Sequence, residues 1–186
     1  MKPLLIGHVF LIICCGFYLA WWCLAFRPGY AGSRVSGIAG ALLLITAVCG
    51  FTGSGFSVAG ILRDGARSAF IHSAAIIIGG ILVYLLLMAG SSLLLHRQVT
   101  TELFLILGWL VLELLSFQTS YRLEATGFTG AVILSVLAAL AAILSLFFYL
   151  EYYRVSDMRG YIYGMVPLIT EALCMVVFLI FCFRKN

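Results

Sequence analysis

The sequence predicts an all-α integral membrane protein, a single bundle of six transmembrane helices. Of the 186 residues, 64% are apolar and only 10% are charged, whereas a soluble domain is nearer half apolar and a quarter charged. The apolar residues form long runs, each with the ~20 residues that a helix needs to cross the hydrocarbon core. Short segments separate these runs, which favours an up-and-down bundle in which neighbouring helices are antiparallel.

Each predicted helix is recognised by the length of its run and by the residues that end it. The first run ends at Arg27-Pro28-Gly29, a sequence that stops a helix. It is longer than the ~7–15 apolar residues of a signal peptide and has no A-x-A cleavage site. The second run is rich in glycine, and the alanine-rich fifth run is expected to pack closely through its alanines. The predicted helices cover about residues 4–26, 35–58, 69–94, 101–120, 128–150 and 160–183 of one transmembrane domain, 1–186.

The charges and aromatic residues suit the ends of membrane helices. The net charge of +4 is spread over the connecting segments in ones and twos, unlike a nucleic-acid-binding patch. Six helices place both termini on one side, which would hold six positive residues: Lys2, Arg63, Arg67, Arg122, Arg184 and Lys185. The other side would hold five: Arg27, Arg34, Arg97, Arg154 and Arg159. This small excess favours cytoplasmic termini in the plasma membrane, and a dual topology stays open.

The cysteine and histidine residues show no pattern of a catalytic or metal site. All six cysteines lie inside apolar runs, without zinc-ligand spacing, and are interpreted as small packing residues. His8 and His72 lie near predicted helix ends and are interpreted as polar side chains at the membrane interface. Gly53-Ser54-Gly55 lacks the full spacing and the mid-helix histidine that an intramembrane serine protease would need. We therefore expect no enzyme activity, no cofactor and no metal.

Two carboxylates in the middle of predicted helices form the candidate site. The fourth run carries a polar stripe at helical spacing, made of Glu102, Trp109, Glu113, Ser116 and Ser120. At ~1.5 Å per residue, Glu113 lies about 18 Å and Glu171 about 15 Å inside helices that enter from the same side. A charge near the bilayer centre costs about 2.5–3.5 kcal/mol, and no Lys or Arg lies mid-helix, so we expect both acids to be uncharged at rest. They could carry a proton or bind a cation, or serve only as hydrogen-bonding groups between helices.

A match at an offset of 90 residues predicts two inverted repeats of three helices each. Residues 36–44 resemble residues 126–134, which aligns the first three helices with the last three. The offset also brings Gly79-Gly80 into correspondence with the region of Pro167 and Thr170. Interrupted helices at matching positions are typical of transporter binding sites. The alternative is that small-residue steps, glycine and proline are simply frequent in membrane helices.

These patterns favour a small transporter or channel that moves a solute or ion, with proton coupling as one option. Its candidate site consists of Glu113, Glu171, Thr170, Ser116 and Trp109. The alternative is a non-catalytic membrane subunit, or a substrate-binding component of a larger transport complex. An enzyme acting on lipid has less support, because no paired nucleophile and base are present. The expected partners are the lipid bilayer and an unknown small solute or ion, and a homo-oligomer or a membrane partner subunit stays open.

Overall fold

The computed structural model describes residues 2–25, 36–64, 101–152 and 158–184, together with the separate positions 79, 82, 86, 89 and 90. Its five continuous helices are α1 Lys2–Ala25, α2 Ser36–Asp64, α4 Thr101–Arg122, α5 Gly127–Tyr152 and α6 Met158–Arg184. Within the described residues, α1, α2, α5 and α6 are long and apolar enough to cross a membrane. This confirms the predicted class at the level of an all-helical chain compatible with membrane insertion. The predicted third helix, 69–94, lies outside the described residues except for those five positions, which are helical.

The predicted boundaries agree with the observed helices to within two residues, except at the end of α2. The sequence placed that end at 58, but the helix continues to Asp64. The extra turns are held by packing against α1, because Ile61 is buried and Gly60 lies directly against the backbone of Leu4. This contact depends on the tertiary structure, so hydropathy along the chain could not reveal it.

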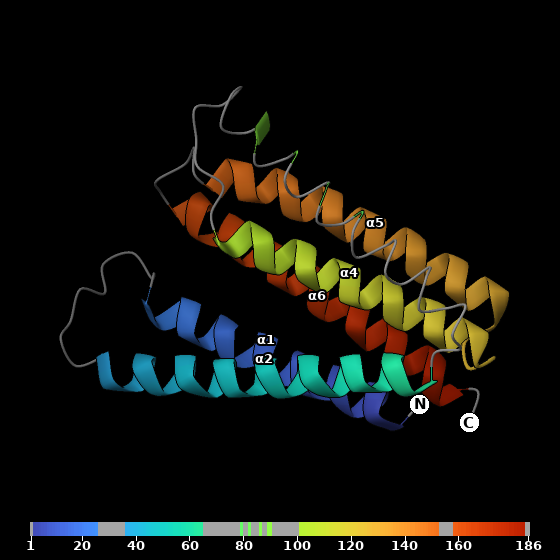
Figure 1. Ribbon diagram of the computed structural model, residues 1–186. Coiled ribbons are helices and arrows are strands. Elements are labelled where there is room, and N and C mark those ends of the chain that lie inside the picture. The colour runs from blue at the N-terminus through green and yellow to red at the C-terminus, as the bar shows by residue number, and fades with distance from the viewer. Residues whose placement is uncertain are drawn as a thin grey trace.

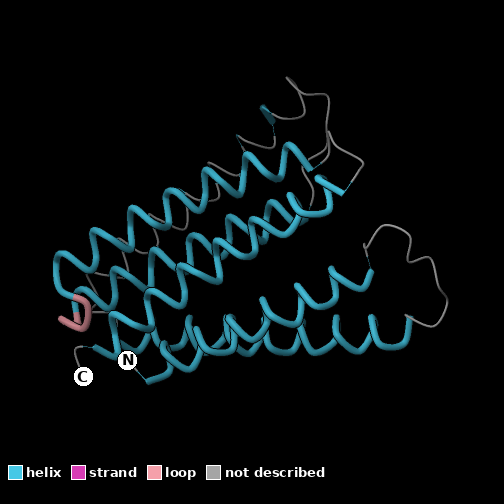
Figure 2. The backbone as a smooth tube through the Cα atoms, turned by 180° about the vertical axis from the view of Figure 1, so that it is seen from behind, coloured by secondary structure: helices cyan, strands magenta, loops and turns pink. Residues whose placement is uncertain are grey.

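The helices form one bundle in which α1 and α2 lie side by side and α4, α5 and α6 make up the other part (Figure 1). Both chain ends lie at the same end of the bundle, as the view from behind also shows (Figure 2). The core agrees with this arrangement, because Leu4 near the start of α1 shares a cluster with Cys182 near the end of α6. We call this the terminal end of the bundle.

The α1–α2 contact is a crossing of helix backbones at small residues. A methyl group on Gly53 would lie 2.9 Å from the carbonyl oxygen of Gly7 and 2.8 Å from Cγ of Leu11. A methyl group on Gly60 would lie 2.8 Å from the backbone nitrogen of Leu4. Such close approach is typical of membrane helices, whose association depends on packing more than on the hydrophobic effect.

A second face of α1 packs against α6 along the length of both helices, and we call this contact the α1–α6 seam. The two helices are antiparallel, so residues later in α1 pack against residues earlier in α6. The contacting residues recur at alternating intervals of three and four, the spacing of one helix face. The His8 ring contacts that of Phe178, and Trp22 lies against Gly164. Leu4 and Cys182 share one core cluster, and Leu11 and Met175 share another.

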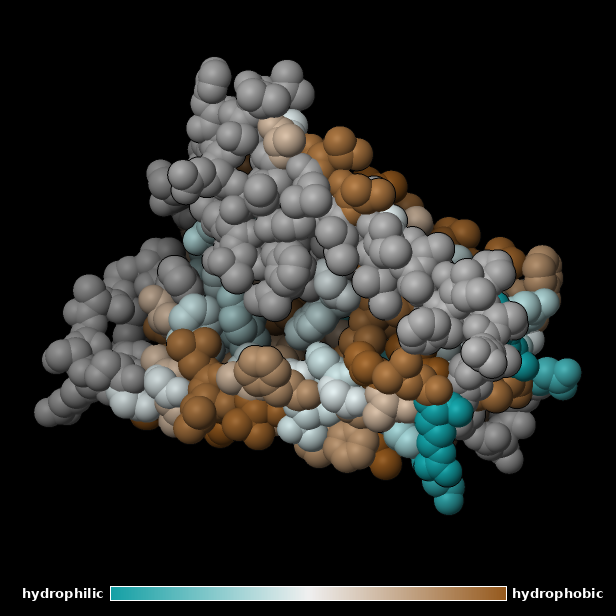
Figure 3. All heavy atoms as spheres, viewed as in Figure 1, coloured by the Kyte–Doolittle hydropathy of each residue, from teal (hydrophilic) through white to brown (hydrophobic). Residues whose placement is uncertain are grey.

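The outer surface is apolar along the helices and charged at the terminal end (Figure 3). Phe51 on α2 is 82% exposed, and Phe128 on α5 is 72% exposed. These side chains would face lipid in a membrane. The exposed basic residues in the described part of the terminal end are Lys2, Arg63, Arg122 and Arg184.

Candidate functional site

The structure brings Glu113 of α4 and Glu171 of α6 together inside the bundle. Their side chains are 2% and 1% exposed, and the two carboxyl groups lie within electrostatic range of each other. None of their four oxygens has a hydrogen-bond partner among the described residues. We call this arrangement the carboxyl pair.

The chemistry of the carboxyl pair follows from the absence of a described cationic or donor partner. An ionised carboxylate only accepts hydrogen bonds, so a bond between two carboxyl groups requires a proton on at least one of them. Two adjacent negative charges in a site with little water would repel each other strongly. The geometry therefore suits a pair that holds a proton, or one that holds a cation between its oxygens.

Residues of the α1–α6 seam surround the carboxyl pair. Cys15 of α1 and Cys174 of α6 are buried and lie within electrostatic range of both acids. Leu11 and Met175 form a small apolar cluster with Cys15 on the same level. The pair is thus enclosed by three helices, and the described conformation shields it from water.

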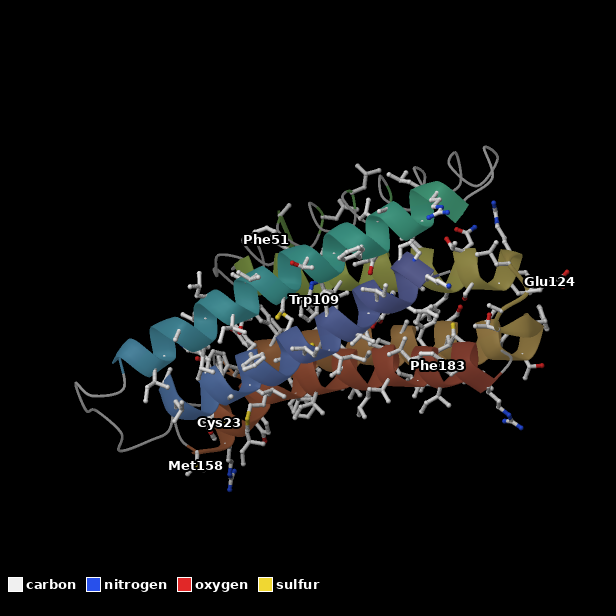
Figure 4. All side chains as sticks on the ribbon, turned by 90° about the horizontal axis from the view of Figure 1, so that it is seen from below. Cys23, Phe51, Trp109, Glu124, Met158 and Phe183 are labelled. Carbon is white, nitrogen blue, oxygen red and sulfur yellow. The ribbon has the colours of Figure 1, made fainter. Side chains whose placement is uncertain are left out.

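The polar stripe of α4 faces the interior over the part whose side chains are described. Glu113, Ser116 and Ser120 are all buried. Trp109 lies in the middle part of the bundle (Figure 4) and packs against the apolar cluster beside Cys15. Glu102 belongs to α4, but its side chain lies outside the described residues.

Ser116 and Thr170 are near the carboxyl pair in sequence but direct their hydroxyl groups elsewhere. Ser116 Oγ donates to the carbonyl oxygen of Leu112 at 2.7 Å, within its own helix. Thr170 Oγ1 donates to the carbonyl oxygen of Pro167 at 2.8 Å and lies 3.3 Å from Ser145 Oγ of α5. Thr170 therefore links α6 to α5 and does not bond to the carboxyl pair.

α1 also borders the site, a contribution that was not predicted from the sequence. His8 was expected at the interface, but its side chain is fully buried, with its ring 4.5 Å from that of Phe178. Its Nδ1 lies 2.9 Å from the carbonyl oxygen of Leu4, and Nε2 has no hydrogen-bond partner in the described part of the chain. The signal was present in α1 as the spacing of Leu4, His8, Leu11 and Cys15, which places them on one helix face.

α6 is helical from Met158 to Arg184 with Pro167 inside it, so the proline does not end the helix. Gly79 is helical, whereas Gly80 and His72 lie outside the described residues. All six cysteines are free thiols. Over the described ranges, no three His, Cys, Asp or Glu side chains lie close enough to bind a metal ion together.

The fold and this site define a class, a helical membrane protein with an acidic pair enclosed by its helices. Comparison of the chain with protein-family models, curated proteins and solved structures finds no match.

Proposed function

We propose that this protein is a small membrane transporter or channel in which Glu113 and Glu171 carry protons or bind a cation. The observation that supports the proposal is that two acids from different helices share one buried site without a cationic partner among the described residues. Placing an ionisable residue inside a membrane costs free energy. A common reason for the presence of such a residue is that it lines a transport path. Enzyme activity is not part of the proposal.

The proposed mechanism requires the carboxyl pair to alternate between a closed state and one that meets water. In the closed state the acids share a proton and are neutral enough to stay among Leu11, Cys15 and Met175. When water reaches them, one acid can release its proton or exchange it for a cation. Movement of α1 against α6 would open this path, because the pair lies on the seam between them.

The decisive substitutions are Glu113→Gln and Glu171→Gln, tested with protons as the probe. Glutamine keeps the size of the side chain and some of its hydrogen bonds but cannot release a proton. We expect each variant to fold, with a stability change of about 1 kcal/mol or less. In proteoliposomes containing a pH-sensitive dye and an imposed proton gradient, proton flux should fall to the level of protein-free vesicles.

The matched control is Glu151→Gln, which changes a carboxylate in the last turn of α5, away from the pair. Its proton flux should equal that of the unmodified protein. Unchanged flux in Glu113→Gln and Glu171→Gln would assign the pair a structural role. If the unmodified protein carries no protons, the same variants should be compared for sodium and potassium flux, and equal cation flux in all of them would refute the proposal.

The finer architecture is also proposed, with six spans, two inverted repeats and cytoplasmic termini in the plasma membrane. α2 ends at the terminal end, where Gly60 meets Leu4. α4 begins at the opposite end, because it runs toward the terminal end, where Phe117 packs against Phe178 at 5.3 Å. The segment between these helices thus joins opposite ends of the bundle, which supports one further crossing.

The second candidate is a non-catalytic subunit or substrate-binding component of a larger transport complex. It is favoured by α2, which packs on α1 with one face and exposes a wide apolar face that includes Leu44, Val48 and Phe51. A partner helix or a second copy of the chain could cover that face. Crosslinking in native membranes from cysteines placed at these positions would distinguish this candidate from a protein surrounded only by lipid.

A further inference from the structure

The surface of the α4–α5 corner at the terminal end has two adjoining shallow cavities, both wide open, that the proposed transport function does not use. One is a polar cavity of about 440 Å³, and its lining includes Tyr121, Arg122 and Glu124. The other is an apolar groove of about 380 Å³ that continues along α5. Tyr121 and Phe128 line both, with their rings in an edge-on contact at 6.4 Å.

The apolar groove runs along α5 from Phe128 to Ala139. This distance is about 16 Å at ~1.5 Å per residue, close to half of the ~30 Å hydrocarbon core. Its floor contains the small residues Ala131, Ser135 and Ala139 at intervals of one helical turn. The Ser135 hydroxyl is already satisfied by the carbonyl oxygen of Ala131 at 2.8 Å, so it does not make the groove polar. The groove therefore has the length and chemistry to hold one acyl chain within one leaflet.

The polar cavity lies where the headgroup of such a lipid would be. Arg122 is exposed in the last turn of α4, and Glu124 follows at the outer edge of the α4–α5 turn (Figure 4). A guanidinium group binds phosphate through paired hydrogen bonds. A carboxylate has about four acceptor positions, so Glu124 can accept from a further cation beside its existing contact.

We propose that this corner is a binding site for a phospholipid with a zwitterionic, amine-bearing headgroup, such as phosphatidylethanolamine. Arg122 binds its phosphate, Glu124 accepts hydrogen bonds from its ammonium group, and an acyl chain fills the groove on α5. One positive and one negative side chain on the same cavity match this headgroup. A choline headgroup has no N–H donors, and an anionic headgroup without an amine would leave Glu124 facing negative charge.

The test uses the full-length protein in detergent and native mass spectrometry of lipids that remain bound. Phosphatidylethanolamine, phosphatidylcholine and phosphatidylglycerol with identical acyl chains are added separately. One phosphatidylethanolamine should be retained with about tenfold higher affinity than the other two, the ratio that one charge-assisted hydrogen bond can produce. Arg122→Gln should weaken its retention by a similar factor, whereas Arg63→Gln, at the same end of the bundle, should not.

Two further substitutions separate headgroup recognition from the groove. Glu124→Gly removes the carboxylate at a backbone position that glycine tolerates, and it should abolish the preference for ethanolamine over choline without unfolding the protein. Ala139→Leu fills the groove and should reduce retention of all three lipids, whereas Ala41→Leu on the exposed face of α2 should not. Equal retention of the three lipids, preference for phosphatidylglycerol, or binding unaffected by Arg122→Gln and Glu124→Gly would overturn the proposal. None of these lipid-binding measurements depends on Glu113 or Glu171, so the lipid proposal can fail without affecting the proposed transport function.

Discussion

Glu124 adopts a backbone conformation that glycine would normally occupy. Its φ is 57°, in the left-handed region, where it follows the last turn of α4. The amide of Glu124 donates to the carbonyl oxygen of Tyr121, and that of Ala125 donates to that of Ser120, each at 2.9 Å. These are the two hydrogen bonds of a Schellman motif, in which the left-handed residue is most often glycine. Any residue with a Cβ atom is strained in this conformation, and the residue at this position carries a charged side chain.

Substitutions of Glu124 should therefore reveal how much this backbone conformation lowers the free energy of unfolding. We expect Glu124→Gly to be more stable than Glu124→Ala by about 1 kcal/mol, because both lose the carboxylate and only glycine relieves the backbone strain. Thermal unfolding of the purified protein in one detergent would measure the difference. If the two variants unfold at the same temperature, the turn does not strain its residue.

Residue spacing in the sequence predicted which side chains of α4 are buried. It did not predict all the residues of other helices that lie beside them. Glu113, Ser116 and Ser120 were placed on one helix face, and all three are buried. The meeting of Glu113 with Glu171 was expected from their similar depths. The presence of Cys15 beside them depends on how α1 is aligned with α6, and spacing within one helix contains no information about that alignment.

At the scale of elements, α1 is the helix on which the described packing depends most. It meets α2 through glycines on one face and α6 through the seam on the other. The glycine content of the second predicted helix was visible in the sequence. The sequence did not show which glycines lie in the contact, because Gly53 and Gly55 differ only in the face that they occupy.

These two glycines provide a matched test of the α1–α2 crossing. Gly53→Ala places a methyl group against the Gly7 carbonyl oxygen and Leu11, so we expect a loss of about 1–3 kcal/mol from overpacking. Gly55→Ala meets no atom within 4 Å and should be neutral, or stabilising by up to about 1 kcal/mol through helix propensity. Thermal unfolding of the two variants would compare them, and equal stability would show that the crossing tolerates a wider spacing.

For the whole molecule, composition predicted the class and left the number of crossings to be tested. An apolar fraction of 64% in runs of membrane-spanning length has few explanations other than membrane helices. The third run, 69–94, lies outside the described residues apart from five positions, so the count of six stays a prediction. The six-to-five division of positive residues carries little information about orientation, because a single charge separates the two sides.

The arrangement of the helices makes a sharper prediction about the termini. Lys2 and Arg184 lie at the ends of α1 and α6 that meet at the terminal end, whereas Arg159 lies at the start of α6, at the other end. If the bundle spans a membrane, the first two should be reached from one side and the third from the opposite side. Cysteines introduced one at a time at these positions would be labelled by a membrane-impermeant maleimide in intact cells and in inverted vesicles. The background is Cys23→Ser with Cys49→Ser, because Cys23 is exposed and Cys49 is partly exposed, whereas the other four native cysteines are buried.

We expect the cysteines in Lys2→Cys and Arg184→Cys to react only in inverted vesicles, which expose the cytoplasmic side, and that in Arg159→Cys to react only in intact cells. The six-to-five division of positive residues favours this orientation by a single charge. Labelling of Lys2→Cys and Arg184→Cys from opposite sides would require an odd number of crossings and exclude the six-helix bundle. Labelling of every position from both sides would instead indicate two orientations of the same bundle. In that case, the headgroup end of the groove on α5 would face both leaflets in the population, and lipid binding there could not depend on the lipid composition of one leaflet.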